Sequence, residues 1–212
     1  TSSNRRKAQL LAFRPDLEVE DLRGNVPTRI QKLRDEDYDA IMIAKAGVSR
    51  LGIDLSEFYV EELDPMEFIP APAQGVLAIQ IRENDTDLAE LLKPLHNASV
   101  AKEIAVERKV LQLFEGGCHM PLGCYCRKEG NIYEVWTSKA VDGDDFPDRL
   151  FLSASSTKGL AEEIVAKFNP ERKFPSNVFI SRMLPETSYF RKALEKYQIQ
   201  LDDRSLIKIF PI

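Results

Sequence analysis

A largely apolar run at residues 38–44 (YDAIMIA), interrupted only by Asp39 and ending at Lys45, limits what this chain can fold into. Runs of this kind are typical of strands that are buried on both faces, as in parallel sheets. The apolar pattern before it predicts a helix closing at Phe13, a strand at residues 17–22 and a second helix around Ile30. The extended stretch at residues 68–73 and the apolar run at residues 76–81 that follows it predict a crossover leading to another strand. Alternating helices and strands of this kind indicate an α/β layer with a parallel, doubly wound sheet in the first part of the chain.

The rest of the chain divides into smaller pieces. Apolar residues at helical spacing predict a helix at residues 97–114, and two strand-like stretches after it flank a Lys-Glu-Gly-Asn hairpin signature. We therefore expect a small α+β domain in the middle of the chain. Residues 169–177 are polar, contain two prolines and predict a linker. A new strand, helix and strand are expected after it, at residues 178–181, 186–197 and 206–209.

The composition excludes several classes of protein. The apolar runs fall far short of the roughly 20 residues that a membrane helix needs. Three cysteines are few for a disulfide scaffold, and an odd number cannot all pair within the chain. We therefore expect the protein to reside in a reducing cytoplasm. A net charge of -5 argues against nucleic acid as a partner. Any anionic ligand must then be met by local arginines. The start at Thr1, without a signal-like segment, is interpreted as a truncation.

Five arginines stand where an anion site would need them. Arg5 and Arg6 lie in the first turn of a helix that Ser2 or Ser3 would cap, although a helix N-terminus favours negative charge. The others are Arg23, Arg29 and Arg50, close to further helix starts. Ligands bind at the carboxyl ends of parallel strands, and guanidinium groups suit bidentate carboxylate recognition. Each one taken singly would be interpreted as a solvated surface charge. The repetition predicts a pocket for several carboxylates or phosphates.

Cys118 follows paired glycines and precedes His119-Met120-Pro121-Leu122-Gly123. The glycines allow a sharp turn and leave room beside the sulfur. Such a thiol is either an accessible nucleophile or attachment point, or a small buried cysteine after a helix end. Cys124 and Cys126 lie two apart on a predicted strand and share one face. For these two we expect core packing rather than zinc, because a C-x-x-C spacing is missing.

Five ordered motifs resemble the porphobilinogen deaminase family, the hydroxymethylbilane synthases. They run in order from Thr1 to about Phe168 and read Thr1-Ser2-Ser3-x-Arg5-Arg6, Leu22-Arg23-Gly24-Asn25-Val26-x-Thr28-Arg29, residues 38–52, Ala73-Gln74-Gly75 and Leu113-Phe114-Glu115-Gly116-Gly117-Cys118. Glu107-Arg108 in the helix before the cysteine also fits the family.

The resemblance implies a three-domain fold whose sheet domains resemble those of periplasmic binding proteins. Residues 1–69 would be the second domain, residues 70–93 a hinge and the returning segment of the first, and residues 94–168 the third, with the cofactor cysteine. The linker would occupy residues 169–177. Residues 178–212 resemble the opening of a uroporphyrinogen-III synthase, which implies a fusion to that enzyme, with a plain C-terminal extension as the alternative.

The resemblance also implies a chemistry. Cys118 would carry a dipyrromethane cofactor through a thioether, and porphobilinogen would be condensed on it stepwise, with loss of ammonia, until hydroxymethylbilane is released in tetrapyrrole (haem) biosynthesis. The residues implied to line the cofactor and substrate cleft are Ser3, Arg5, Arg6, Arg23, Gly24, Asn25, Arg29, Arg50 and Gln74. No metal is implied, and a monomer is expected. The family's catalytic aspartate would lie upstream, so this fragment alone is expected to be inactive.

One alternative is a non-enzymatic anion-binding module of the periplasmic-binding-protein type, which the α/β part and the extended residues 68–73 would also suit. Such a binder has no need of a Gly-Gly-Cys loop in an added domain. A zinc-dependent regulatory domain is a second alternative, and it predicts bound metal without pigment. The mass of the intact protein distinguishes a thiol that carries the cofactor from a bare one.

Overall fold

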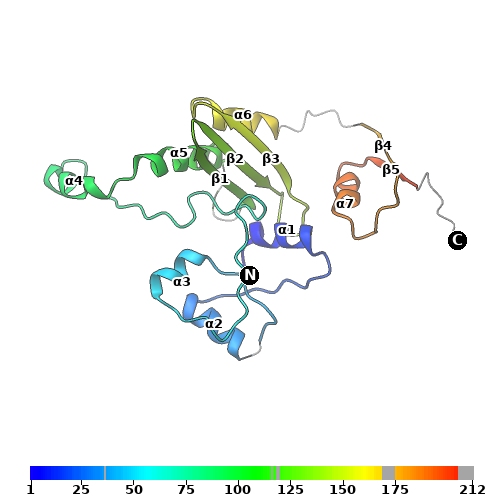
Figure 1. Cartoon of the computed structure of the whole chain (residues 1–212), viewed down its shortest axis with the longest axis horizontal. Helices are drawn as coiled ribbons and strands as arrows, with labels where there is room; N and C mark the ends of the chain where they lie inside the picture. Colours follow the sequence, from blue (N-terminus) through cyan, green and yellow to red (C-terminus); the bar gives the residue numbers. More distant parts are fainter. Residues whose placement is uncertain (36, 116, 118–119, 169–174, 205–212) are drawn as a thin grey trace.

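The computed structural model describes residues 1–35, 37–115, 117, 120–168 and 175–204 (Figure 1). Helices dominate the first half of the chain and strands appear only in the second half of the described residues. The elements before the first strand are α1 (Asn4–Phe13), α2 (Val26–Arg34), α3 (Lys45–Leu51), α4 (Thr86–Leu92), the short 3-10 helix η1 (Lys93–Leu95) and α5 (Ala98–Leu113).

An antiparallel sheet with two helices forms the centre of the molecule. We call it the sheet unit: α5, the strands β1 (Leu122–Glu129), β2 (Ile132–Lys139) and β3 (Asp148–Ala154), and α6 (Leu160–Lys167). β1 and β2 form the expected hairpin, which turns at Gly130 with φ 57°. The side chain of Asn97 caps α5 by accepting from the amides of Ser99 and Val100. The predicted α+β arrangement in this part of the chain is confirmed.

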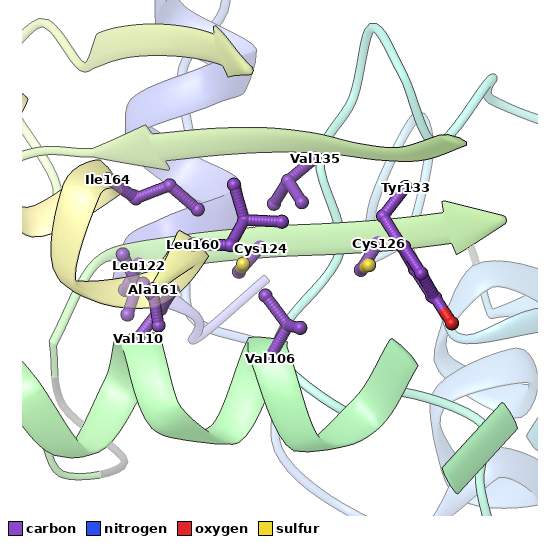
Figure 2. Close-up of a cluster of buried hydrophobic side chains, with 10 residues drawn as sticks. All are labelled: Val106, Val110, Leu122, Cys124, Cys126, Tyr133, Val135, Leu160, Ala161 and Ile164. Atoms are coloured by element: carbon purple, nitrogen blue, oxygen red, sulfur yellow. The ribbon is translucent and has the colours of Figure 1, made fainter. Parts of the chain in front are cut away.

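The core of the sheet unit lies between the sheet and the two helices (Figure 2). Ten buried side chains form it: Val106, Val110, Leu122, Cys124, Cys126, Tyr133, Val135, Leu160, Ala161 and Ile164. Cys124 and Cys126 point to the same face of β1, as their spacing predicts, and both are buried. Their predicted role in core packing is confirmed.

The strands expected in the first part of the chain do not form. Among the described residues before α5 no segment is assigned to a strand, so the predicted parallel sheet with strands at residues 17–22, 38–44 and 76–81 is wrong for this structure. The helices on either side were predicted correctly, as α1 and α2. Residues 41–44 are half-buried rather than enclosed on both faces.

Two side chains at or just before the start of α1 occupy backbone groups that a strand ladder would use. The Ser2 hydroxyl accepts from the Leu22 amide at 3.0 Å and donates to the Leu22 carbonyl oxygen at 3.1 Å. The Arg6 guanidinium donates to the Met42 carbonyl oxygen at 2.9 Å. An extended segment becomes a stable strand when a neighbouring strand bonds to its backbone and other elements cover its faces. Here the backbone groups of Leu22 and Met42 bond to side chains from the start of α1 instead.

The third expected strand, at residues 76–81, also lacks a partner strand among the described residues, and its side chains are more exposed than those of residues 41–44. Leu77 and Ile79, which would share one face, are 74% and 61% exposed, and Val76, which would lie on the other, is 41% exposed, so neither face is covered. The residues form an apolar run, but such a run becomes a strand only where a neighbouring strand supplies hydrogen bonds.

α1 lies against the sheet unit (Figure 1). The Arg149 guanidinium sits over the Phe13 ring at 5.4 Å and donates to the Met66 carbonyl oxygen at 3.3 Å. Lys7 pairs with Asp144 at 2.7 Å, in the loop between β2 and β3. Arg5 donates to the Ile69 carbonyl oxygen, and the Cys124 amide donates to that of Pro70, so the first turn of α1 and residues 69–70 lie close to the start of β1.

The last described residues form a separate unit, which we call the C-terminal unit. It consists of β4 (Asn177–Ile180), α7 (Tyr189–Lys196) and β5 (Gln200–Asp203), and the two strands pair in parallel. The predicted first strand and helix are confirmed as β4 and α7, and β5 was not predicted. The strand predicted at residues 206–209 lies outside the described residues. No described helix has the length and apolar character needed to cross a bilayer.

Candidate functional site

The first turn of α1 begins the candidate site. Ser3 is its N-cap, with an extended backbone, and its hydroxyl accepts from the Arg6 amide at 3.4 Å. The first turn contains no acidic residue, but it contains Arg5 and Arg6. Two cations therefore sit at the helix end whose partial charge is already positive, and that arrangement favours an anion between them.

Arg5 is buried, with 6% of its surface exposed. Its guanidinium donates to the Ile69 carbonyl oxygen at 2.7 Å and to the Gln74 side-chain oxygen at 3.3 Å. Burial, followed by the nearby charge of Arg6, lowers the pKa of Arg5 to about 10. Arg5 stays protonated at neutral pH, and its neutral partners leave its positive charge uncompensated.

Arg6 and Arg29 form a second pair of like charges. Arg6 reaches the Met42 carbonyl oxygen, and Arg29 donates to the Gly24 carbonyl oxygen at 2.8 Å. Burial, and then the charge of Arg29, lower the pKa of Arg6. Because the charge of Arg29 disfavours the charged form of Arg6, an anion placed near them would relieve that repulsion.

Gly24 and Asn25 shape the start of α2. Gly24 has φ 119°, and a Cβ there would approach the Thr28 side chain within 2.8 Å. Asn25 is the N-cap of α2, and its side-chain oxygen accepts from the Thr28 amide at 2.9 Å. The glycine is thus required by both its conformation and its space, and the turn that it makes holds the carbonyl group to which Arg29 binds.

Arg50 and Arg23 differ from each other. Arg50 follows the same pattern as Arg6 and Arg29, because its guanidinium donates to the carbonyl oxygen of Gly75, the residue after Gln74. Arg23 is a surface residue whose side chain is 85% exposed and lies 3.7 Å from the Asp21 carboxylate. The structure therefore brings Arg5 and Gln74 into contact, ties Arg50 to the same segment, and leaves Arg23 on the surface.

Backbone or amide oxygens hold four of the predicted arginines, namely Arg5, Arg6, Arg29 and Arg50. Among the described residues none of these four forms an ion pair with a carboxylate. Arg34, in contrast, pairs with Glu57 on the surface. Carbonyl oxygens orient a guanidinium without neutralising it, so its remaining donors and its charge stay available to an anionic ligand.

Cys118 and His119 lie outside the described residues. The adjoining Gly117 is exposed, and a Cβ built there would meet no atom within 4 Å, so the chain next to Cys118 has open space beside it. Glu115, before the loop, has φ 54°. Burial raises the pKa of Cys126 to about 12 and raises that of Cys124 further, which keeps both as unreactive thiols.

Two polar residues organise the site: sequence reasoning did not identify Gln9, and it noted Glu107 only for its fit to the family, without a structural role. Gln9 is 1% exposed; it donates to the Ile69 carbonyl oxygen at 2.9 Å and accepts from the Ile69 amide at 2.8 Å. Glu107 is 3% exposed and accepts from the Ala73 amide at 2.6 Å. A signal existed for Glu107, because it stands at helical spacing among the apolar residues of α5. For Gln9 the signal was its position four residues after Arg5, on the same helix face.

These features belong to a protein of mixed α and β structure, in which arginines near helix starts are oriented by neutral oxygens and have donors free to meet an anion. Comparison with known proteins points to a particular family. Residues 1–90 match the family model described as porphobilinogen deaminase, dipyromethane cofactor binding domain.

Curated relatives agree with the family match. The chain is 50% identical over 131 residues to a porphobilinogen deaminase of Fusobacterium nucleatum, a match that covers 62% of this chain and 43% of that protein. It is 48% identical over 167 residues to that of Oceanobacillus iheyensis, covering 79% of this chain and 52% of the relative. For the Exiguobacterium protein the identity is 43% over 162 residues, covering 76% and 52%. The chain is thus similar to porphobilinogen deaminases, and it spans about half the length of the relatives it matches.

Proposed function

We propose that this chain is part of a hydroxymethylbilane synthase, in which it supplies the arginine-bearing face of the cofactor and substrate cleft. The observation that carries the proposal is the set of four arginines held by neutral oxygens, without a carboxylate partner among the described residues. Each porphobilinogen unit brings an acetate and a propionate. A growing chain of such units is a polyanion, and it requires guanidinium groups that are oriented but not neutralised.

The residues present fit a dipyrromethane cofactor. The family model that matches residues 1–90 is named for binding it. The carboxylates of such a group suit the donors of Arg5, Arg6 and Arg29, whose guanidinium groups are held by neutral oxygens. When bound, the cofactor supplies the pyrrole carbon on which the product chain is extended.

The roles of the chain's residues follow from their contacts. Arg6 and Arg29 bind carboxylates beside the start of α2, and Gly24 and Asn25 hold that turn in place. Ser3 caps the helix that presents Arg5 and Arg6, Arg50 fixes the segment at Gly75, and Gln74 orients Arg5. Arg23 lies at the exposed margin of the cleft. No acid–base group within this chain is assigned.

The domain limits are part of the proposal. Residues 1–69 would form the second domain, with the doubly wound fold of periplasmic binding proteins when its partner strands are present. Residues 70–93 would form a hinge and a segment of the first domain, and residues 94–168 the third. The uncovered apolar side chains of Leu77 and Ile79 support this assignment, because an exposed apolar stretch indicates a surface that another element covers.

The attachment of the cofactor gives the decisive test. The protein that carries this chain is purified, its intact mass is measured, and its peptides are mapped. We expect the adduct on Cys118, and we expect Cys118→Ser to lose both the adduct and hydroxymethylbilane formation from porphobilinogen. Cys126→Ser is the matched control and should keep both. Active protein with an unmodified Cys118 would contradict the proposed attachment, and binding of porphobilinogen without turnover would favour the non-enzymatic anion-binding module.

The C-terminal unit is proposed to begin a fused uroporphyrinogen-III synthase. Its parallel strands joined by α7 are a βαβ start, which supports a new domain over a simple extension. The complete protein should then convert hydroxymethylbilane to uroporphyrinogen III without an added enzyme. Accumulation of hydroxymethylbilane, or its non-enzymatic ring closure to the type I isomer, would count against the fusion.

A further inference from the structure

A buried carboxylate joins the sheet unit to the segment that contacts Arg5. Glu107, on α5, is 3% exposed, and each of its two carboxylate oxygens accepts from a different segment of the chain. One accepts from the Ala73 amide at 2.6 Å, and the other accepts from the Cys126 amide on β1 at 2.8 Å. Buried carboxylates are normally paired with a cation. Within the described residues Glu107 forms no ion pair, so both of its contacts are with backbone amides.

The Ala73 end of this link is conformationally unusual. Ala73 has φ 60°, in the left-handed region that residues with a side chain rarely adopt. A turn closes here, with the Gln74 amide donating to the Ala71 carbonyl oxygen at 3.0 Å. The next side chain, that of Gln74, accepts from Arg5 at 3.3 Å. The bond from Ala73 to Glu107 thus fixes the residue immediately before the one that touches Arg5.

The other end of the link lies where the same segment meets β1. The Cys124 amide donates to the Pro70 carbonyl oxygen at 2.9 Å. At Gly123 a Cβ would come within 2.7 Å of the Ile69 carbonyl oxygen, so only glycine allows this approach. Residues 69–73 therefore run along the first half of β1. Glu107 secures the far end of that contact, and Arg5 and Gln9 bind Ile69 at the near end.

We propose that Glu107 is a positioning residue, which holds Ala73 in its left-handed conformation and thereby keeps Gln74 against the Arg5 guanidinium. It couples the unit that follows the Cys118 loop to the arginine-bearing face, without touching substrate itself. The structural part of the inference stands on the contacts; its kinetic part rests on the proposed function. Burial raises the pKa of the Glu107 carboxyl to about 7. The negative charge of Glu103, on the same helix, also raises this pKa.

The test uses Glu107→Gln, which keeps the size of the side chain but leaves a single acceptor oxygen for two amides. The matched control is Glu103→Gln, one turn earlier on α5, where the carboxylate accepts from the Lys128 amide at 2.9 Å and makes no contact with residues 71–74. Hydrogen exchange of the amides is measured in the full protein. Loss of a hydrogen bond to a charged group predicts exchange at Ala73 or Cys126 that is faster by about tenfold or more in Glu107→Gln. In Glu103→Gln both amides should exchange as in the wild type.

Steady-state kinetics supply a second test, because a purely structural role of Glu107 would leave KM for porphobilinogen unchanged. We expect Glu107→Gln to raise KM for porphobilinogen about fivefold while kcat changes less than about twofold, because binding is weakened equally in ground and transition states. Gln74→Ala, at an exposed position, should give the same rise in KM with wild-type exchange at Ala73. Since both changes break one chain of contacts, the double variant should be no worse than either single variant.

Each outcome decides the proposal. Wild-type exchange at Ala73 and Cys126 in Glu107→Gln, or additive losses in the double variant, would overturn it. If Glu107→Gln does not fold, Gln74→Ala decides instead: a raised KM supports the coupling and a wild-type KM refutes it. If the wild-type protein shows no turnover at all, the proposed function fails, while the exchange result still tests the contact itself.

Discussion

We call residues 1–75 the arginine region. The sheet unit and the arginine region differ in what holds their chain in place. In the sheet unit ten side chains from helices and strands share one core. In the arginine region, by contrast, the buried apolar side chains are few and dispersed, and Tyr59 is 93% exposed. Its buried polar groups, Arg5 and Gln9, do as much to fix the chain as its apolar ones.

The difference separates stability from function within one chain. A shared apolar core stabilises a unit by burial, which is proportional to the area removed from water. Cations oriented by carbonyl oxygens gain little stability, because their charges repel one another and are partly desolvated. The arginine region thus keeps its positive charge available for a ligand, and the sheet unit supplies the support on which residues 69–74 are fixed.

The largest expected effect is the loss of ligand binding when an arginine of the arginine region is replaced. Arg6→Leu and Arg29→Leu should each weaken porphobilinogen binding by roughly 2 to 5 kcal/mol, because a carboxylate loses an oriented guanidinium partner. Arg29→Lys should recover only part of the loss, since an ammonium group makes no bidentate contact. Binding is measured by calorimetry and stability by urea unfolding.

A matched control for these variants lies on α2 itself. Arg34→Leu removes an arginine that is already paired with Glu57 on the surface, so binding should change by less than about twofold. Arg23, which is exposed beside Asp21, should show a smaller loss than Arg6. Equal losses in Arg34→Leu and Arg29→Leu would show that the pairing of an arginine does not predict its role.

The next prediction concerns the two kinds of apolar residue. Ile164 is fully buried in the core of the sheet unit, and Ile164→Ala should lower the free energy of unfolding by about 2 to 5 kcal/mol. Leu77 is 74% exposed, and Leu77→Ala should change it by less than about 0.5 kcal/mol. Urea unfolding followed by the fluorescence of Trp136, which lies on β2, gives both values. A large cost for Leu77→Ala would mean that another element covers that residue in solution.

Local signals predicted α1, α2, α5 and α7, the hairpin and the placement of Cys124 and Cys126, but not α3 or α4. An N-cap such as Asn25 or Asn97 satisfies its own helix end, so a few neighbouring residues suffice to identify it. The run at residues 38–44 has the composition of a strand, but a strand depends on partners that are distant in sequence. Here the guanidinium of Arg6 binds that run instead, and no spacing rule anticipates such a contact.

The candidate site was predictable to the same extent. The unusual position of cations in the first turn of α1 is visible in the sequence, and it identified Arg5 and Arg6. Their partners were not visible, because Ile69 and Met42 contribute carbonyl oxygens that every residue has. What could be known beforehand was therefore which side chains carry charge, and what required the structure was which oxygens orient them.

A pH dependence is expected in the sheet unit. Burial raises the pKa of Glu107 from 4.5 to about 7, although the two amide contacts lower it in part. Between these values the folded state binds more protons than the unfolded state, so this contribution to stability is present below pH 4.5 and is lost as the pH rises through about 7. The slope for one group reaches at most about 1.4 kcal/mol per pH unit.

Glu107→Gln should remove this part of the slope, because its amide does not titrate. Urea unfolding of both proteins at several pH values, again followed by Trp136, measures the difference. Glu103→Gln serves as the control and should retain most of the slope. A wild-type slope of the opposite sign in this range would show that the amide contacts outweigh burial and hold the carboxyl ionised.

The smallest effect decides whether the two regions unfold together. Asn97 caps α5 in the sheet unit and Asn25 caps α2 in the arginine region, each through its side-chain oxygen. Asn97→Ala should lower the free energy of unfolding reported by Trp136 by about 1 kcal/mol, the usual cost of a lost cap. Asn25→Ala should change that value by less than about 0.5 kcal/mol, because α2 lies away from the sheet unit and its loss is expected to be local. Faster hydrogen exchange at the Thr28 amide should show that the cap of α2 is nevertheless gone. If both variants shift the Trp136 transition equally, the arginine region and the sheet unit unfold as a single cooperative unit. The two regions would then differ in their charge but not in their stability.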